Sequence, residues 1–151
     1  MKLLVCFDGS EQSYKAVEAA KELADGYDNA EITLLHVYPE KEASIWQQVK
    51  ENKMRPSMEL TSHERLLIER FMQVNKMVKK VEEEFDKKRR KVTVKIVKGD
   101  PVKRIASFAA EENYDLIVIG SRGLGGVKKF MLGSVSSGVI KQATINVLIV
   151  K

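Results

Sequence analysis

Glycine and serine residues follow one very apolar stretch of the chain, in a spacing that suits the binding of phosphate. Residues 116–119 are all aliphatic, Gly120 and Gly123 come directly after them, and Gly133 lies ten residues further on. Glycine allows backbone N–H groups to come close to a ligand. A helix that begins after Gly133 would add free N–H groups and the positive end of its dipole. The segment 120–136 therefore predicts a site for a polyanion with two or three phosphates.

Side chains of the same segment add to this predicted phosphate site. Ser134 and Ser136 carry hydroxyl donors, and Arg122 together with either Lys128 or Lys129 carries positive charge. The competing interpretation is a simple turn, in which Ser134 only caps the next helix. Four glycines lie within seven residues between a predicted strand and a predicted helix, and this density favours the phosphate site.

Other nucleotide-binding and catalytic motifs are absent from the sequence. It contains no Walker A motif, and Asp8-Gly9-Ser10 stands where a dinucleotide fold would have G-x-G-x-x-G. His36 and His63 are the only histidines, and neither has metal-ligand spacing. We interpret His36, inside a predicted strand, as a structural residue, and no G-x-S-x-G nucleophile motif is present. The sequence thus predicts groups that hold phosphate and identifies no catalytic residue.

Apolar runs alternate with helical patterns from one end of the chain to the other. Strands are expected at residues 2–7, 31–38, 91–97, 115–120 and 146–150, and helices after Ser10, Thr61 and Asp100 and at 134–143. This alternation predicts an α/β fold with a doubly wound, five-stranded parallel sheet in the order 3-2-1-4-5. Ligands bind such sheets where the strand order reverses, here between the first and fourth strands. The loops after these strands begin at Asp8 and Gly120.

The connection between the second and third strands is longer than an ordinary crossover. Thr61 and Glu64 form a capping-box pattern. Apolar residues then recur at steps of four and three along residues 67–85, which predicts a long amphipathic helix packed on the sheet. Residues 40–58 are expected to form a short helix and a variable excursion. The length of the chain fits a single domain over residues 1–151.

The composition is that of a globular protein and favours neither nucleic acid nor a membrane as partner. The net charge is +5, but much of the basic excess lies at 76–91, interleaved with acidic residues and without alternating aromatic residues for base stacking. No apolar run reaches the roughly 20 residues of a membrane span. Cys6 is the single cysteine, so we expect no internal disulfide and a cytoplasmic location.

The run G-2x-G-9x-G-S, formed by Gly120, Gly123, Gly133 and Ser134, resembles the signature of the ATP-binding universal stress proteins. The resemblance extends over nearly the whole chain outside residues 40–58. It implies a Rossmann-like fold of the adenine nucleotide alpha hydrolase-like type. It also implies ATP as the ligand, with an accompanying Mg²⁺ or Mn²⁺ ion bound through the phosphates.

The same resemblance assigns roles to individual residues. It implies that Asp8 lies against the adenosine and that the Val37 backbone contacts adenine. It implies further contacts to ribose and phosphates from Gly120, Gly123, Gly133, Ser134 and Ser136, with Arg122 and the backbone of Ile119 and Val135 at matching positions. Relatives commonly dimerise through the last strand, so a homodimer through residues 146–150 is expected, and such pairing would cover an apolar edge.

The leading interpretation is a binding protein in which ATP occupancy switches the surface of the dimer for a protein partner during stress. One alternative is an enzyme that hydrolyses ATP slowly or transfers its phosphoryl group, since phosphoryl transfer depends mostly on positioning and charge. Another is a dimeric scaffold that keeps the fold without using the nucleotide. The sequence identifies neither the partner nor the stress.

Overall fold

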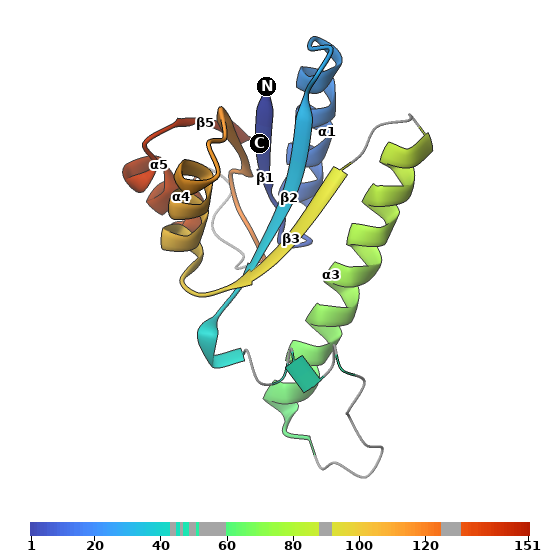
Figure 1. Ribbon diagram of the computed structural model, residues 1–151. Coiled ribbons are helices and arrows are strands. Elements are labelled where there is room, and N and C mark those ends of the chain that lie inside the picture. The colour runs from blue at the N-terminus through green and yellow to red at the C-terminus, as the bar shows by residue number, and fades with distance from the viewer. Residues whose placement is uncertain (43–44, 46, 49–50, 52–59, 88–91, 125–130) are drawn as a thin grey trace.

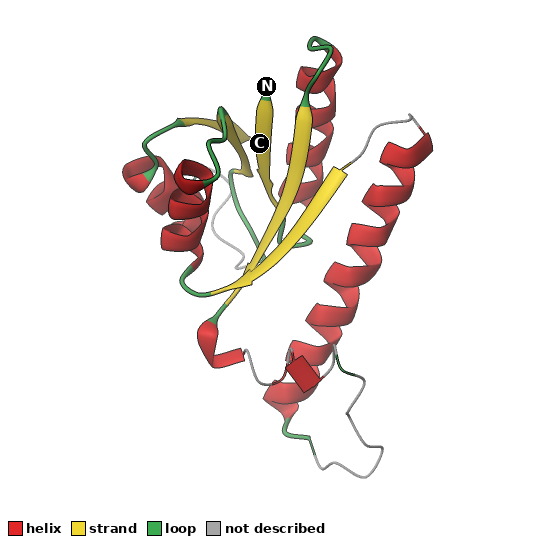
Figure 2. Cartoon of the chain, in the orientation of Figure 1, coloured by secondary structure: helices red, strands yellow, loops and turns green. Residues whose placement is uncertain are grey.

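Five parallel strands form the centre of the structure, which is a computed structural model describing residues 1–42, 45, 47–48, 51, 60–87, 92–124 and 131–151 (Figures 1 and 2). The strands are β1 (Lys2–Cys6), β2 (Glu31–Tyr38), β3 (Val92–Lys98), β4 (Leu116–Gly120) and β5 (Asn146–Val150). The helices are α1 (Glu11–Asp25), the short 3-10 helix η1 (Glu40–Glu42), α3 (Ser62–Lys87), α4 (Pro101–Glu111) and α5 (Ser134–Gln142).

The sheet has the strand order β3-β2-β1-β4-β5, and every neighbouring pair is parallel. This confirms the predicted α/β fold and its 3-2-1-4-5 order. The chain crosses from β1 towards one edge of the sheet and then returns to build the other side from β4. The reversal therefore falls between β1 and β4, and the loops that leave these two strands lie next to each other.

Helices cover both faces of the sheet. Helices α1 and α3 pack on one face, and α4 and α5 pack on the other (Figure 1). The predicted apolar stripe of α3 is buried along its whole length, at Leu67, Phe71, Val74, Val78, Val81 and Phe85. The last four of these residues belong to the first of the two cores. The second core joins Ile105 and Ala109 of α4 to Val139 of α5 and to the strands.

Side chains cap three of the helices at the predicted positions. Ser10 accepts a hydrogen bond from the third residue after it, and Asp100 does the same at the start of α4. Thr61 and Glu64 form the reciprocal capping box of α3, with the Thr61 N–H donating to the Glu64 carboxylate at 2.8 Å. Gly26 ends α1, and its φ of −83° is not the left-handed conformation that favours glycine at this position.

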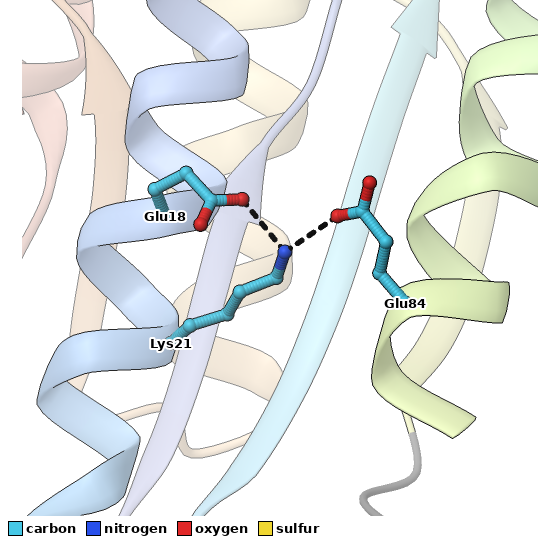
Figure 3. A network of polar contacts seen from close by, with 3 residues as sticks. All are labelled: Glu18, Lys21 and Glu84. Carbon is cyan, nitrogen blue, oxygen red and sulfur yellow. Dashed lines mark hydrogen bonds and ion pairs between the residues drawn. The ribbon is translucent and has the colours of Figure 1, made fainter. Parts of the chain in front are cut away.

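A buried lysine joins α1 to α3 (Figure 3). The Nζ atom of Lys21 lies 2.6 Å from Oε1 of Glu18 on its own helix and 2.8 Å from Oε2 of Glu84 on α3. The same ammonium lies over the ring of Phe85. Burying a charge is costly unless it is paired, and here two carboxylates and an aromatic face surround it. The contact fixes α3 against the layer formed by α1.

Strand β3 lies at the edge of the sheet, where Val92 and Val94 pack on the α1–α3 core and Ile96 is 40% exposed. Two sets of predictions lie mostly or wholly outside the described residues. Most of the excursion predicted at 40–58 lies outside the described residues, apart from η1 and a few isolated positions. The glycines and lysines predicted to assist at 125–129 also lie outside them.

Candidate functional site

A cavity of about 300 Å³ opens at the carboxyl ends of β1, β2 and β4. Its walls come from the loops after these strands, the first turns of α4 and α5, η1 and the N-terminal half of α3. The structure brings all ten of the predicted site residues to this one cavity: Asp8, Val37, Ile119, Gly120, Arg122, Gly123, Gly133, Ser134, Val135 and Ser136. That these residues bind a nucleotide stays a prediction.

The loops after β1 and β4 touch each other at the reversal of the strand order. Oδ1 of Asp8 accepts a hydrogen bond from the Ser10 N–H at 2.9 Å, which fixes the carboxylate at the start of its loop. The Ser10 hydroxyl in turn lies 3.5 Å from the Arg122 carbonyl oxygen. A Cβ atom on residue 123 would collide with Oδ2 of Asp8. Gly123 therefore allows the Asp8 carboxylate to lie directly against the backbone of the glycine loop.

Gly120 meets a different constraint from Gly123. A Cβ atom at residue 120 would lie 2.8 Å from the Gln12 backbone carbonyl carbon and 2.9 Å from its oxygen. Gln12 belongs to the first turn of α1. A side chain at this position would thus force apart the end of β4 and the start of α1. Packing between β4 and α1 therefore requires glycine at residue 120, whether or not a ligand is bound.

The N-terminus of α5 has no side-chain cap. Its N-cap residue is Gly133, with φ −64° and ψ 159°, and Ser134 is the first residue of the helix rather than its cap. The Gly133 N–H donates to the Ser121 carbonyl at 2.8 Å, which fixes the chain as it enters the helix. The first N–H groups of a helix have no partner within the helix. Those of α5 therefore receive no side-chain acceptor, and they belong to residues that line the cavity.

The two serines of α5 play different parts. Ser134 is exposed and Ser136 is buried. The Ser136 hydroxyl lies 3.0 Å from the carbonyl oxygens of both Ser121 and Gly133, and its single proton is shared between them. Ser136 thereby ties the first turn of α5 to the end of β4. Ser134, in contrast, is an exposed residue of the cavity lining.

The opposite wall contains charged residues that the sequence pattern did not single out. Glu42 of η1 and Arg70 of α3 both line the cavity beside His36. Nδ1 of His36 lies 2.8 Å from the Phe7 carbonyl oxygen, as expected of a structural residue. Burial lowers the pKa of His36 below its usual value, although the Phe7 contact and the charges of Asp8 and Glu42 oppose this. The imidazole is therefore neutral near pH 7 and donates through Nδ1.

The sequence gives only a weak indication that Glu42 and Arg70 line the cavity. Arg70 lies three residues after Leu67, at the edge of the apolar stripe of α3, and Glu42 follows β2 at the end of the sheet where ligands bind. Cys6 also lines the cavity, but burial raises the pKa of its thiol well above the usual range. Cys6 is therefore a buried structural residue with little thiolate character.

In the described part of the chain, no three His, Cys, Asp or Glu side chains gather in a way that could hold a metal ion. Within the same residues, no helix is both long enough and apolar enough to span a bilayer.

Comparison with known proteins assigns the chain to a family. A model of the universal stress protein family matches residues 1–151. The chain is 34% identical to universal stress protein YxiE of Bacillus subtilis, covering 99% of this chain and 98% of that protein. It is also 34% identical to universal stress protein MJ0531 of Methanocaldococcus jannaschii, covering 99% and 81% of the two chains.

Solved structures agree with this assignment. The structure of MJ0577, a further universal stress protein of Methanocaldococcus jannaschii, superimposes with a TM-score of 0.74 at 30% identity and covers 99% of this chain and 94% of its own. Sequence and structure thus match the same family along the whole length of the chain. The protein belongs to the universal stress protein family.

Proposed function

We propose that the cavity binds ATP and that nucleotide occupancy switches the surface which the protein presents to a partner. The observation that carries the proposal is the N-terminus of α5, which has no side-chain cap, at the mouth of a cavity on the reversal point of the sheet. Anions bind at such helix ends because free N–H groups and the helix dipole both favour negative charge. The cavity lies at the lower end of the size range of small-molecule sites, roughly 300–1,000 Å³.

The chemistry of the cavity walls suggests how such a ligand would be oriented. The first turn of α5 and Arg122 would hold the phosphates, and Gly123 would leave room for them beside the Asp8 loop. The base would lie towards the end of β2, where Val37 and Ile119 supply apolar surface. A Mg²⁺ or Mn²⁺ ion would enter together with the phosphates and be held through them.

Structures of more distant members support an adenine nucleotide as the ligand class. One universal stress protein was solved in complex with cAMP; it is 24% identical and superimposes with a TM-score of 0.54. A family member from Arabidopsis thaliana was solved with AMP bound, at 19% identity and a TM-score of 0.67. At these identities the likeness of each to this chain is one of fold. The choice of ATP over these nucleotides rests on the glycine spacing of the loop.

Contacts of α3 support the idea that occupancy could be sensed elsewhere in the molecule. Leu67, Arg70 and Val74 of this helix line the cavity. Its Met77 packs against Gly9, whose φ of +83° requires glycine, in the loop that follows Asp8. A ligand that moves this loop would therefore push on α3. For the partner-facing surface we propose a homodimer through β5, an edge strand that antiparallel pairing with a second copy would cover.

The experiment is a titration of the purified protein with ATP, AMP and cAMP, together with mass spectrometry of nucleotide released on denaturation. ATP is expected to bind most tightly. The nucleotide recovered after a long incubation separates stable binding from slow hydrolysis, because hydrolysis would leave ADP. A protein that neither carries nor takes up any adenine nucleotide would refute the proposal.

A matched pair of variants tests the role of α5. The nearest atom to a Cβ at residue 133 would be 3.4 Å away, and the backbone there has the extended conformation of an N-cap, so Gly133→Ser and Gly133→Asp both fit. Each should change stability by only roughly a few tenths of a kcal/mol. Gly133→Asp should nevertheless lose far more ATP affinity, because its carboxylate takes the place of a phosphate. Equal affinity of the two variants would argue against phosphate binding at this helix end.

A further inference from the structure

A histidine side chain ends the hydrogen-bond ladder between β1 and β2. The last pair of this ladder is Cys6 with Leu35, and just beyond it the Phe7 N–H donates to the Leu35 carbonyl at 2.9 Å. In a parallel ladder the next bond would run from the Val37 N–H to the Phe7 carbonyl. The pairing stops before that bond, and the Phe7 carbonyl oxygen instead lies 2.8 Å from Nδ1 of His36. Because a carbonyl oxygen only accepts, Nδ1 carries the proton and takes the place of the Val37 N–H.

The backbone N–H of Val37 is thereby left facing the cavity. The next residue, Tyr38, accepts a hydrogen bond from the Gly99 N–H on the β3 side. Backbone groups of neighbouring residues in a strand point to opposite sides, so the Val37 N–H points away from β3 and towards β1. At this level β1 has ended, and Val37 lines the cavity that opens there. Among the described residues no hydrogen bond reaches the Val37 N–H, so its partner is water or a ligand.

The same hydrogen bond fixes the start of the Asp8 loop. The Phe7 carbonyl belongs to the peptide bond that joins Phe7 to Asp8, so its direction sets the direction in which the chain leaves β1. The Asp8 carboxylate then accepts from the Ser10 N–H at 2.9 Å and lies against the backbone of Gly123. His36 therefore acts on two parts of the cavity at once: it orients the loop after β1 and leaves a backbone donor at the end of β2.

We propose that His36 is a positioning residue for the base of the nucleotide: by occupying the Phe7 carbonyl, it keeps the Val37 N–H free to donate to a ring nitrogen of adenine. The inference rests on the proposed nucleotide site. The resemblance in sequence implies a contact between adenine and the Val37 backbone, and His36 supplies the reason why that backbone is available. Without the imidazole, the Val37 N–H and the Phe7 carbonyl would pair with each other. The ladder would then be one bond longer, and the cavity would lose this donor.

Two replacements of His36 separate this role from the mere filling of space. In His36→Asn the side-chain amide carries an N–H donor bonded to Cγ, as Nδ1 of histidine is, whereas leucine has no donor. His36→Asn should keep most of the wild-type affinity for ATP. His36→Leu should weaken ATP binding about three- to tenfold, the equivalent of one hydrogen bond. A space-filling role predicts the reverse order, because leucine suits a buried site better than asparagine, so equal or tighter binding by His36→Leu would overturn the inference.

Hydrogen exchange of single backbone amides, measured by NMR, gives a readout that needs no variant. In the ligand-free wild type the Val37 N–H should exchange at least about tenfold faster than the Leu35 N–H, which lies inside the ladder. Saturating ATP should slow the exchange of Val37 by about the same factor. In His36→Leu the Val37 N–H should be protected before ATP is added. A Val37 N–H that is as protected as that of Leu35 in the ligand-free wild type would overturn the inference.

His63→Leu is the control for the loss of a histidine as such. His63 is exposed in the first turn of α3 and does not line the cavity. Its replacement should leave both the ATP affinity and the exchange of the Val37 N–H unchanged. If the wild type binds ATP and His36→Leu binds it equally well, the inference is overturned and the proposed function stands. Failure of the wild type to bind any adenine nucleotide would overturn both.

Discussion

Two glycines of the loop after β4 should respond in opposite ways to the addition of one methyl group. A Cβ at residue 120 would lie 2.8–2.9 Å from the backbone of Gln12, whereas a Cβ at residue 123 would meet only the carboxylate of Asp8. Neither glycine has the left-handed backbone conformation that would by itself exclude alanine. The effects of Gly120→Ala and Gly123→Ala therefore follow from what each methyl group touches.

The contacts set the size of each effect. In Gly120→Ala the first turn of α1 must move away from β4, and overpacking of this kind costs about 1–3 kcal/mol. In Gly123→Ala the Asp8 carboxylate can rotate away at the expense of its hydrogen bond to the Ser10 N–H, a loss of about 1 kcal/mol. Replacing glycine by alanine restricts the unfolded chain and returns about 0.4–1 kcal/mol. Gly123→Ala should therefore be nearly as stable as the wild type.

The affinity for ATP should differ between the two variants in the opposite sense to their stability, with the larger loss in Gly123→Ala. Gly123→Ala moves the Asp8 carboxylate off the glycine loop at the mouth of the cavity, so we expect a loss of at least about tenfold in ATP affinity, the equivalent of one lost hydrogen bond to a charged group. In Gly120→Ala the new methyl group presses against the first turn of α1. The fraction of this variant that remains folded should therefore keep most of its affinity for ATP. The assays are urea unfolding followed by circular dichroism and calorimetric titration with ATP.

Gly26→Ala is the control for the loss of a glycine as such. Gly26 lies at the end of α1, its φ is −83°, and a Cβ would lie 3.5 Å from the Leu23 carbonyl oxygen, an ordinary contact. We expect its stability and its ATP affinity to be close to those of the wild type. The reasoning fails if Gly120→Ala unfolds at the wild-type urea concentration, or if Gly123→Ala binds ATP as the wild type does.

Two pH-dependent predictions follow from buried titratable groups. Burial alone would lower the pKa of Lys21, but its hydrogen bonds to Glu18 and Glu84 outweigh burial and raise the pKa above its ordinary value of 10.5. Its contribution to stability is thus complete below that value and is lost at more alkaline pH, so Lys21→Met should remove the alkaline decline in urea midpoint above pH 10.5. The pKa of His36 is lowered by burial from 6.5, so the unfolded state binds more protons below that pH and stability falls as the pH falls. His36→Asn should flatten this acid limb between about pH 6.5 and 5, and the exposed His63→Asn should not; an unchanged acid limb in His36→Asn would contradict the assignment.

Much of the fold could be predicted from the sequence because each element carries its own local signal. The strands β2 and β5 have the predicted bounds, and the N-caps Ser10, Thr61 and Asp100 start their helices where expected. Periodicity and capping depend on residues only a few positions apart, so they can be read without knowledge of the fold. The alternation of strands and helices then left few possible strand orders.

The candidate site could be predicted only where it follows the strands of the sheet. The loops at Asp8 and Gly120 follow strands whose order was predicted, so their meeting at the cavity could be foreseen. Glu42 and Arg70 belong to the long connection between β2 and β3. Their approach to the cavity depends on how this connection packs, and no local pattern encodes that. The sequence pattern likewise does not distinguish Gly120 from Gly123. A side chain at residue 120 would collide with the first turn of α1, whereas one at residue 123 would collide with the Asp8 carboxylate.

One helix that the fold leaves without a side-chain cap begins at the cavity. Helices α1, α3 and α4 have side-chain caps, whereas α5 has none, and its first turn lines the cavity. Among the described residues, the buried side-chain atom without a hydrogen-bond partner is Nε of Arg104, which lies outside the cavity lining. Local rules tend to be broken at functional sites. The free N–H donors at the start of α5 are complementary to the phosphates of a nucleotide, and this complementarity is the main support for the proposed site.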